Sequence, residues 1–153
     1  MHATAIWRRD ESRMIGVVIV THCRLAEELI AAAKLVVGEE LKQFQPVSIG
    51  PSEGTEDIRE KIVGAIRKVD EGQGVLILTD MYGGTPSNIS LSFLEDKKIE
   101  VITGVNLPML LKLATYPNEM DLEKLAVYIT EYGQRNINLA SEVLKKRVEK
   151  KKN

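Results

Sequence analysis

The apolar residues of this chain fall into short continuous runs and longer stretches of helical spacing, which alternate along the sequence. Residues 15–20 form an unbroken aliphatic run rich in β-branched side chains, and residues 75–78 form a second one. Uninterrupted runs of this kind are typical of strands buried on both faces of a parallel sheet. Two weaker runs, residues 46–49 and 99–102, predict two further strands.

Apolar residues at helical spacing follow each predicted strand. The stretches are residues 25–36, 58–69, 89–94, 107–113 and 122–144, the last being predicted as one long final helix. Thr55, Asn106 and Asp121 precede three of these stretches and are predicted N-caps. Thr85 followed by Pro86 predicts the start of another, with proline in the first helical turn.

This alternation of strands and helices predicts an α/β fold. We expect an open, doubly wound, mainly parallel four-stranded sheet in the order 2-1-3-4, with helices on both faces and a long C-terminal helix. Residues 14–148 are predicted to form one domain, and residues 149–153 a charged tail. Residues 1–13 lack the apolar centre of a secretory signal and are expected to be a disordered N-terminal extension.

The bulk composition is that of an ordinary globular domain, with 44% hydrophobic and 28% charged residues among 153. A formal net charge of −1 gives no basic surplus for nucleic acid or for an anionic membrane. No apolar run is long enough to span a bilayer. The single cysteine, Cys23, excludes an intrachain disulfide and fits a cytoplasmic location.

The distinctive polar residues cluster after the predicted strands. They lie in residues 21–23, 50–52, 80–86 and 103–106. Because ligands of open parallel sheets bind beyond the carboxyl ends of the strands, these four loops are the candidate site.

His22 is the only histidine of the predicted domain, since His2 lies in the extension. It follows a buried strand and precedes a helix, whose free N–H groups and partial positive charge favour a bound phosphate. The same field disfavours an imidazolium, so His22 is expected to be neutral and nucleophilic. The alternative is a structural histidine beside a helix end, because position in a fold is weak evidence by itself.

Asp80 ends the third predicted strand, which should lie beside the first. Its carboxylate could accept a hydrogen bond from one ring nitrogen of His22 and leave the other nitrogen free to attack phosphorus. An ordinary turn cap is the alternative reading of Asp80. Gly83 and Gly84 permit close backbone approach, and with Thr85 they could surround a phosphoryl group.

Other chemistries find little support. The sequence has no Gly-x-x-x-x-Gly-Lys-Ser/Thr motif for a nucleoside triphosphate. Two histidines and one cysteine give no metal-ligand spacing, so neither a metal nor a cofactor is expected. Cys23 is interpreted as a small space-filling residue rather than a nucleophile.

Three stretches together resemble the mannose-family enzyme IIA components of the bacterial sugar phosphotransferase system. They are residues 15–22, 78–88 and 104–110. In that family the first stretch is a strand ending in the phosphorylated histidine, the position of His22. The second is a strand ending in an aspartate that pairs with this histidine, the position of Asp80.

The resemblance covers residues 14–145 and implies a phosphotransferase. His22 would accept phosphate from the histidine phosphocarrier protein and donate it to a IIB component in sugar uptake through membrane components. No cofactor is implied, and such domains are usually homodimers. Thr21, Tyr82 and Asn106 lie in the matching stretches and are expected to line the site or to face a partner.

The chain departs from the family at Tyr82, where mannose-specific members carry tryptophan. No IIB domain is expected after the last predicted helix, and no apolar run after Met120 matches the edge strand that some dimeric relatives exchange. Three other functions stay open: a stand-alone regulatory IIA protein, a phosphoryl donor subunit of a dihydroxyacetone kinase, and a flavodoxin-like binding module with a structural His22.

Overall fold

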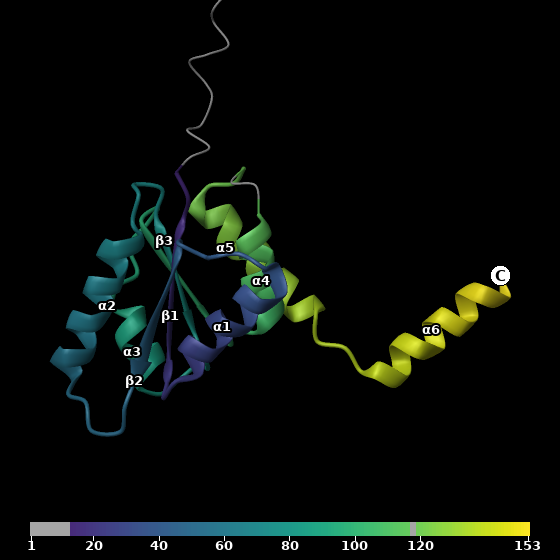
Figure 1. Ribbon diagram of the computed structural model, residues 1–153, viewed down its shortest axis with the longest axis horizontal. Coiled ribbons are helices and arrows are strands. Elements are labelled where there is room, and N and C mark those ends of the chain that lie inside the picture. Colours follow the sequence, from purple (N-terminus) through teal and green to yellow (C-terminus); the bar gives the residue numbers. More distant parts are fainter. Residues whose placement is uncertain (1–12, 117–118) are drawn as a thin grey trace, which may run out of the picture.

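The computed structural model describes residues 13–116 and 119–153, in which strands and helices alternate as predicted (Figure 1). The elements are β1 (Gly16–His22), α1 (Leu25–Val37), β2 (Phe44–Ile49), α2 (Thr55–Val69), β3 (Val75–Thr79), α3 (Thr85–Leu91), β4 (Ile99–Thr103), α4 (Leu107–Thr115), α5 (Leu122–Arg135) and α6 (Ala140–Lys152).

The four strands form one parallel sheet in the order β2-β1-β3-β4, which confirms the predicted order. Val20 of β1 pairs with Val47 on one side and with Thr79 on the other. This register brings the carboxyl ends of β1 and β3 together at one edge of the sheet. The residues that follow these two strands are therefore neighbours in space.

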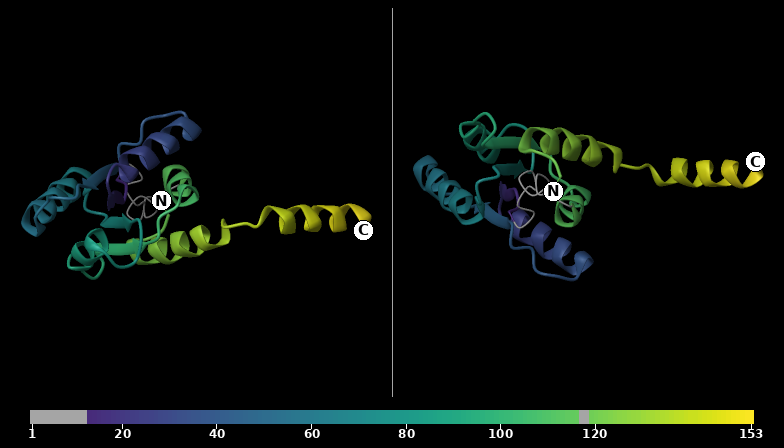
Figure 2. Two further views of the ribbon diagram at one scale, coloured as in Figure 1. Left: turned by 90° about the horizontal axis from the view of Figure 1, so that it is seen from below. Right: turned by 90° about the horizontal axis from the view of Figure 1, so that it is seen from above.

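Helices cover both faces of the sheet, with α1, α4 and α5 on one side and α2 and α3 on the other (Figures 1 and 2). Val17 and Ile19 of β1 belong to the first apolar core, and Val18 and Val20 belong to the second. Since side chains of a strand alternate between its faces, a strand covered on both sides needs an unbroken apolar run. Each fully buried aliphatic side chain contributes about 1.5–3 kcal/mol.

Two of the four predicted N-caps are confirmed. The side chains of Asn106 and Asp121 accept hydrogen bonds from the amide three residues further on, at 3.1 and 2.9 Å. Thr55 and Thr85 are instead the first helical residues, and neither helix has a side-chain cap. Gly84 occupies the N-cap position of α3 with φ 84° and ψ 171°, a conformation that only glycine adopts readily.

The prediction of one long final helix is wrong in its middle, although a helix does end the chain. Residues 136–139 separate α5 from α6. The side-chain amide of Asn136 donates to the carbonyl of Tyr132 at 2.8 Å and stabilises the end of α5. No residue of α6 is buried, and the helix projects away from the sheet and its covering helices (Figures 1 and 2).

The predicted N-terminal extension, residues 1–13, lies outside the described residues except for Arg13. Of the predicted charged tail, residues 149–152 continue α6. No helix within residues 13–116 and 119–153 combines the length and apolarity needed to cross a bilayer.

Candidate functional site

The structure brings His22 and Asp80 together at the carboxyl edge of the sheet. The ring nitrogen Nδ1 of His22 lies 2.7 Å from Oδ2 of Asp80. The same carboxylate oxygen accepts the backbone N–H of His22 at 3.0 Å. One oxygen thus fixes both the main chain and the ring of the histidine.

This contact determines which ring nitrogen is free. An ionised carboxylate only accepts hydrogen bonds, so the imidazole proton resides on Nδ1 and donates to Asp80. Nε2 then carries the free lone pair. The side chain of Asp80 is only 11% exposed, whereas that of His22 is 48% exposed. The arrangement fixes the ring through Nδ1 and leaves Nε2 with its lone pair on a half-exposed side chain.

Thr21, the residue before the histidine, links β1 to α1 through its side chain. Its side chain is fully buried, and its hydroxyl oxygen accepts the amide N–H of Ala26 at 2.8 Å in the first turn of α1. This bond ties the end of β1 to the start of α1. Thr21 therefore lies behind the site and cannot face a partner protein.

Cys23 is exposed, so its interpretation as a space-filling residue is wrong. Its backbone has φ 51°, and its N–H donates to the carbonyl of Ile49 at 2.8 Å. A left-handed residue at this point turns the chain sharply from β1 into α1. The turn leaves the His22 ring at the surface.

The loop after β3 passes close to the Nε2 side of the ring. A Cβ atom built on Gly84 would lie 3.4 Å from Cε1 and 3.5 Å from Nε2 of His22. Gly83 also has a positive φ of 83°, but a Cβ there would meet nothing within 4 Å. Gly84 is therefore the glycine that borders Nε2.

A hollow of about 300 Å³ opens beside the ring and is lined in part by His22, Thr85 and Glu53. Glu53 accepts the amide N–H of Gly50 at 3.0 Å and pairs with Nζ of Lys61 at 2.6 Å. The hydrogen bond from Lys61 is the main cause of a lowered pKa of Glu53, and the bond from Gly50 is the next. These bonds hold the loop between β2 and α2 that forms one wall of the hollow.

Sequence reasoning did not single out Glu53. Its signal is its place in the chain, because Glu53 directly follows residues 50–52, one of the four candidate loops. The ion pair with Lys61 joins the loop between β2 and α2 to the second turn of α2. It could not be predicted, because apolar spacing does not fix how that loop lies against the helix.

Tyr82 and Asn106, two other predicted site residues, are not among the residues that line the hollow beside the ring. Tyr82 is 77% exposed on the loop after β3. The side chain of Asn106 caps α4 and also donates to the carbonyl of Gly133 at 3.0 Å. Asn106 thus joins α4 to α5, and its polar atoms are used within the fold.

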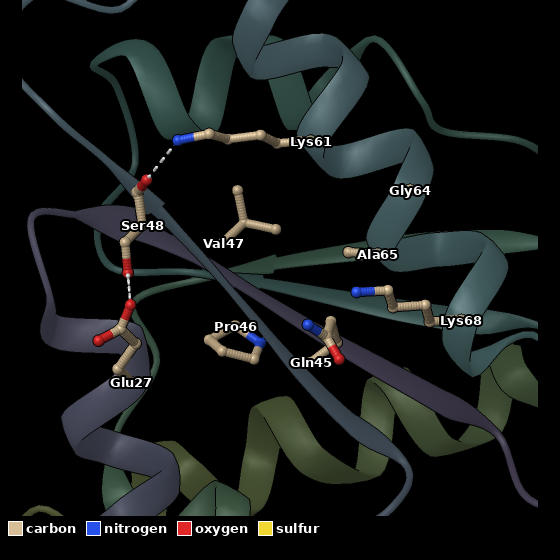
Figure 3. Close-up of a pocket in the computed structure, with 9 residues that line it drawn as sticks. All are labelled: Glu27, Gln45, Pro46, Val47, Ser48, Lys61, Gly64, Ala65 and Lys68. Carbon is tan, nitrogen blue, oxygen red and sulfur yellow. Dashed lines mark hydrogen bonds between the residues drawn. The ribbon is translucent and has the colours of Figure 1, made fainter.

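A second hollow, of about 400 Å³, lies at the free edge of β2 and does not include His22 (Figure 3). Lys61 donates to the carbonyl of Ser48 at 3.3 Å, and the hydroxyl of Ser48 donates to Glu27 at 3.4 Å. Pro46 and Lys68 also border it. Pro46 has no backbone N–H to donate to an added strand, and Lys61 and Lys68 of the neighbouring helix α2 line the same hollow. We therefore interpret this edge of the sheet as protected from pairing with another chain.

No group of three metal-ligating side chains occurs in the part of the chain that the structure describes. The chemistry available at the site is that of the imidazole, the carboxylate, backbone amides and a hydroxyl.

Comparison with known proteins gives a consistent result. A family model described as "PTS system fructose IIA component" matches residues 16–129. A sorbose-specific EIIA component of the phosphotransferase system (PTS) from Lacticaseibacillus casei is 33% identical over 114 residues, which are 74% of this chain and 81% of that protein.

The mannose-specific EIIAB component of Escherichia coli K12 is 34% identical over 125 residues, 80% of this chain, and this chain spans only 38% of its length. Among solved structures, the mannose/sorbose-specific IIA subunit from Enterococcus faecalis aligns with a TM-score of 0.74 at 28% identity. That alignment covers 82% of this chain and 94% of the other.

Proposed function

Because the chain belongs to the PTS fructose IIA component family, whose members are phosphotransferase subunits in sugar uptake, we propose that Nε2 of His22 accepts and donates the phosphoryl group. The donor would be the phosphohistidine of the histidine phosphocarrier protein, and the acceptor would be a IIB component. The observation that carries the proposal is the 2.7 Å contact between Nδ1 and Asp80, which leaves Nε2 free on a half-exposed ring.

In the proposed step, the lone pair of Nε2 attacks the phosphorus of the donor phosphohistidine. The new N–P bond forms as the donor N–P bond breaks, and the donor imidazole leaves with that electron pair. The Nδ1 proton stays on His22, and Asp80 offsets the positive charge that the ring gains. Transfer to the IIB component is the same displacement with His22 as the leaving group.

The surroundings of Nε2 suit a phosphoryl group. Gly84 has no side chain and borders Nε2, so the backbone of its loop can approach the phosphate oxygens. Thr85, at the start of α3, lines the same hollow and carries a hydroxyl that can donate a hydrogen bond to a phosphate oxygen. Transfer between two histidines needs mainly positioning and electrostatic stabilisation, which these groups supply.

The proposal is tested by incubating the protein with phosphoenolpyruvate, enzyme I and the histidine phosphocarrier protein, followed by intact mass and site mapping. We expect one acid-labile phosphoryl group on His22. His22→Ala should take up none, whereas His2→Ala, the matched control at the other histidine, should be phosphorylated normally. Phosphorylation of His22→Ala would refute the proposal.

A stand-alone regulatory role would use the same histidine chemistry. Incubating the phosphorylated protein with a purified IIB component separates the two roles. Transfer to IIB supports the relay, and retention of phosphate on His22 in its presence contradicts that part of the proposal.

A further inference from the structure

The C-terminal arm, residues 136–152, leaves large apolar side chains in contact with water. Ile137, Leu139, Leu144 and Val148 are each more than half exposed. Within α6, Leu144 and Val148 are four residues apart and therefore lie on one side of the helix, one turn from each other. Grouped apolar side chains on a projecting segment indicate a surface that another molecule covers.

The charge of the arm differs from that of the rest of the chain. α6 contains six lysine or arginine residues and two glutamates, which give the helix a formal charge of +4. Since the whole chain carries −1, the remaining residues together carry −5. A basic surplus that the overall charge does not show is therefore concentrated on one exposed helix, where it can attract an anionic surface.

The acidic residues of α6 lie on the side opposite to its main apolar side chain. Glu142 and Glu149 are seven residues apart, close to two helical turns, so they share one side. Leu144 falls on the opposite side, together with Arg147 and Lys151. One side of the helix is thus apolar and basic, and the other side carries both carboxylates.

The basic side chains of α6 have no carboxylate partner among the described residues. None of them lies within ion-pair distance of an acidic side chain there, although Lys145 and Lys146 follow Glu142 by three and four residues. Ion pairs inside the arm would weaken its attraction for an external anion. These charges are therefore available to an anionic partner.

An anionic lipid surface fits this combination better than a protein groove or a nucleic acid does. A groove that excluded water would bury the charges of Arg147 and Lys151 beside Leu144, and a buried charge without a partner is costly. A nucleic acid supplies phosphates but no apolar floor for Leu144 and Val148. Lipid headgroups supply phosphate oxygens at the level of the basic side chains, and the acyl chains below them accept apolar side chains.

We propose that α6 lies along an anionic lipid surface with its apolar and basic side toward the headgroups. With 13 residues and a rise of about 1.5 Å each, the helix is about 20 Å long. That length is less than the ~30 Å hydrocarbon core of a bilayer, so α6 lies on the surface and does not cross it. The arm projects from the sheet and its covering helices, so α6 can meet a flat surface along its whole length (Figures 1 and 2). The inference does not depend on the chemistry of His22.

The first test is the binding of the full chain to lipid vesicles, measured by co-sedimentation. We expect binding to vesicles of equal parts phosphatidylglycerol and phosphatidylcholine, and at least about tenfold weaker binding to phosphatidylcholine alone. Raising the salt from about 0.05 M to about 0.5 M should weaken the binding by about tenfold or more, because salt screens the charges. Failure to bind the anionic vesicles at low salt overturns the proposal.

Lys146→Gln/Lys150→Gln removes two basic charges from one flank of α6. Since each basic residue near an anionic surface contributes about fivefold in affinity, this variant should bind about 25-fold more weakly than the wild type. Lys42→Gln/Lys124→Gln, the matched control, removes the same charge from exposed lysines outside the arm and should bind as the wild type does. An equal loss in both variants would show that the arm is not the binding segment, which overturns the proposal.

Leu144→Gln tests the apolar part of the contact and should weaken vesicle binding by about tenfold. Leu35→Gln, at an exposed apolar position on α1, is its control and should bind normally. Sedimentation equilibrium of the same two variants separates lipid from a second copy of the chain as the occupant. If Leu144→Gln dissociates an oligomer but leaves vesicle binding unchanged, the arm serves the second copy and the proposal is overturned.

A label on the arm identifies which part of the chain meets the lipid. In a Cys23→Ser background, a polarity-sensitive fluorophore on Val148→Cys should shift its emission to the blue when the anionic vesicles are added, because the label enters a less polar layer. The same label on Leu35→Cys should not shift. A shift at Leu35→Cys without one at Val148→Cys would place a different face on the lipid and overturn the proposal.

Discussion

At the carboxyl end of β1, the side chain of His22 is fixed by groups of its own chain, whereas the large apolar side chains of the C-terminal arm, residues 136–152, are exposed. Asp80 holds both the ring and the backbone N–H of His22, and buried Thr21 holds the helix that follows. In α6 no residue is buried. The difference separates a site whose groups hold one another from a segment that the rest of the described chain does not cover.

The largest expected difference between the two regions is in folding stability. Ile19 is fully buried at the centre of the sheet, so Ile19→Ala should lower the free energy of unfolding by about 2–5 kcal/mol. Leu144→Ala removes a similar side chain from the arm and should change it by less than about 0.5 kcal/mol.

Both values come from urea unfolding at the same low protein concentration. A cost at Leu144 as large as that at Ile19 would show that the arm packs within its own chain.

Asp80→Asn tests how much the fixed ring matters for phosphoryl transfer. An amide can donate to Nδ1 as well as accept from it, so the proton is no longer confined to Nδ1. We expect phosphorylation of His22 to slow by about 10–100-fold, as for other residues that orient a reactive histidine. Rapid-quench measurement of the transfer rate tests this.

Asp57→Asn, at an exposed carboxylate in the first turn of α2, is the control and should transfer at the wild-type rate. If Asp80→Asn also kept that rate with its fold intact, the assigned role of Asp80 would be lost.

Gly84→Ala adds a methyl group beside Nε2 of His22, where the loop after β3 lies close to the ring. The conformation of Gly84, φ 84° and ψ 171°, is strained for any residue with a Cβ, at a cost of about 1–3 kcal/mol. The added methyl would also lie 3.4 Å from Cε1 of His22. We expect lower stability together with slower phosphorylation.

Gly64→Ala is the matched control, because Gly64 lies inside α2 and an added Cβ meets nothing within 4 Å. It should stabilise the protein by about 0.5–1 kcal/mol. Thermal unfolding and the phosphorylation assay, applied to both variants, distinguish a local effect at the ring from a general effect of removing glycine.

The same contrast explains how much the sequence predicted. The strand order and the meeting of His22 with Asp80 follow from unbroken apolar runs, because such runs are buried by their own chain. The break at residues 136–139 could not be predicted, since Ile137 and Leu144 continue a helical spacing without having anything to pack against. The contact of Gly84 with the ring depends on the path of a loop, which apolar spacing does not encode.

The ion pair between Glu53 and Lys61 is completed within the chain but lies at the surface, and it should give the smallest effect. The pKa of the Glu53 carboxyl is lowered in the folded state, chiefly by the hydrogen bond from Lys61. The pair therefore stabilises the fold fully at pH values above the ordinary pKa of a glutamate. That stability should fade as the pH falls through the lowered value, because a protonated carboxyl loses the pair. Salt should weaken the ion pair as well, since exposed pairs are screened.

Urea unfolding of the wild type and of Glu53→Gln between about pH 3 and pH 7 tests this prediction. The free energies of unfolding of the two proteins should differ near neutrality and converge in acid. A constant difference at every pH would show that the carboxylate charge does not hold the loop.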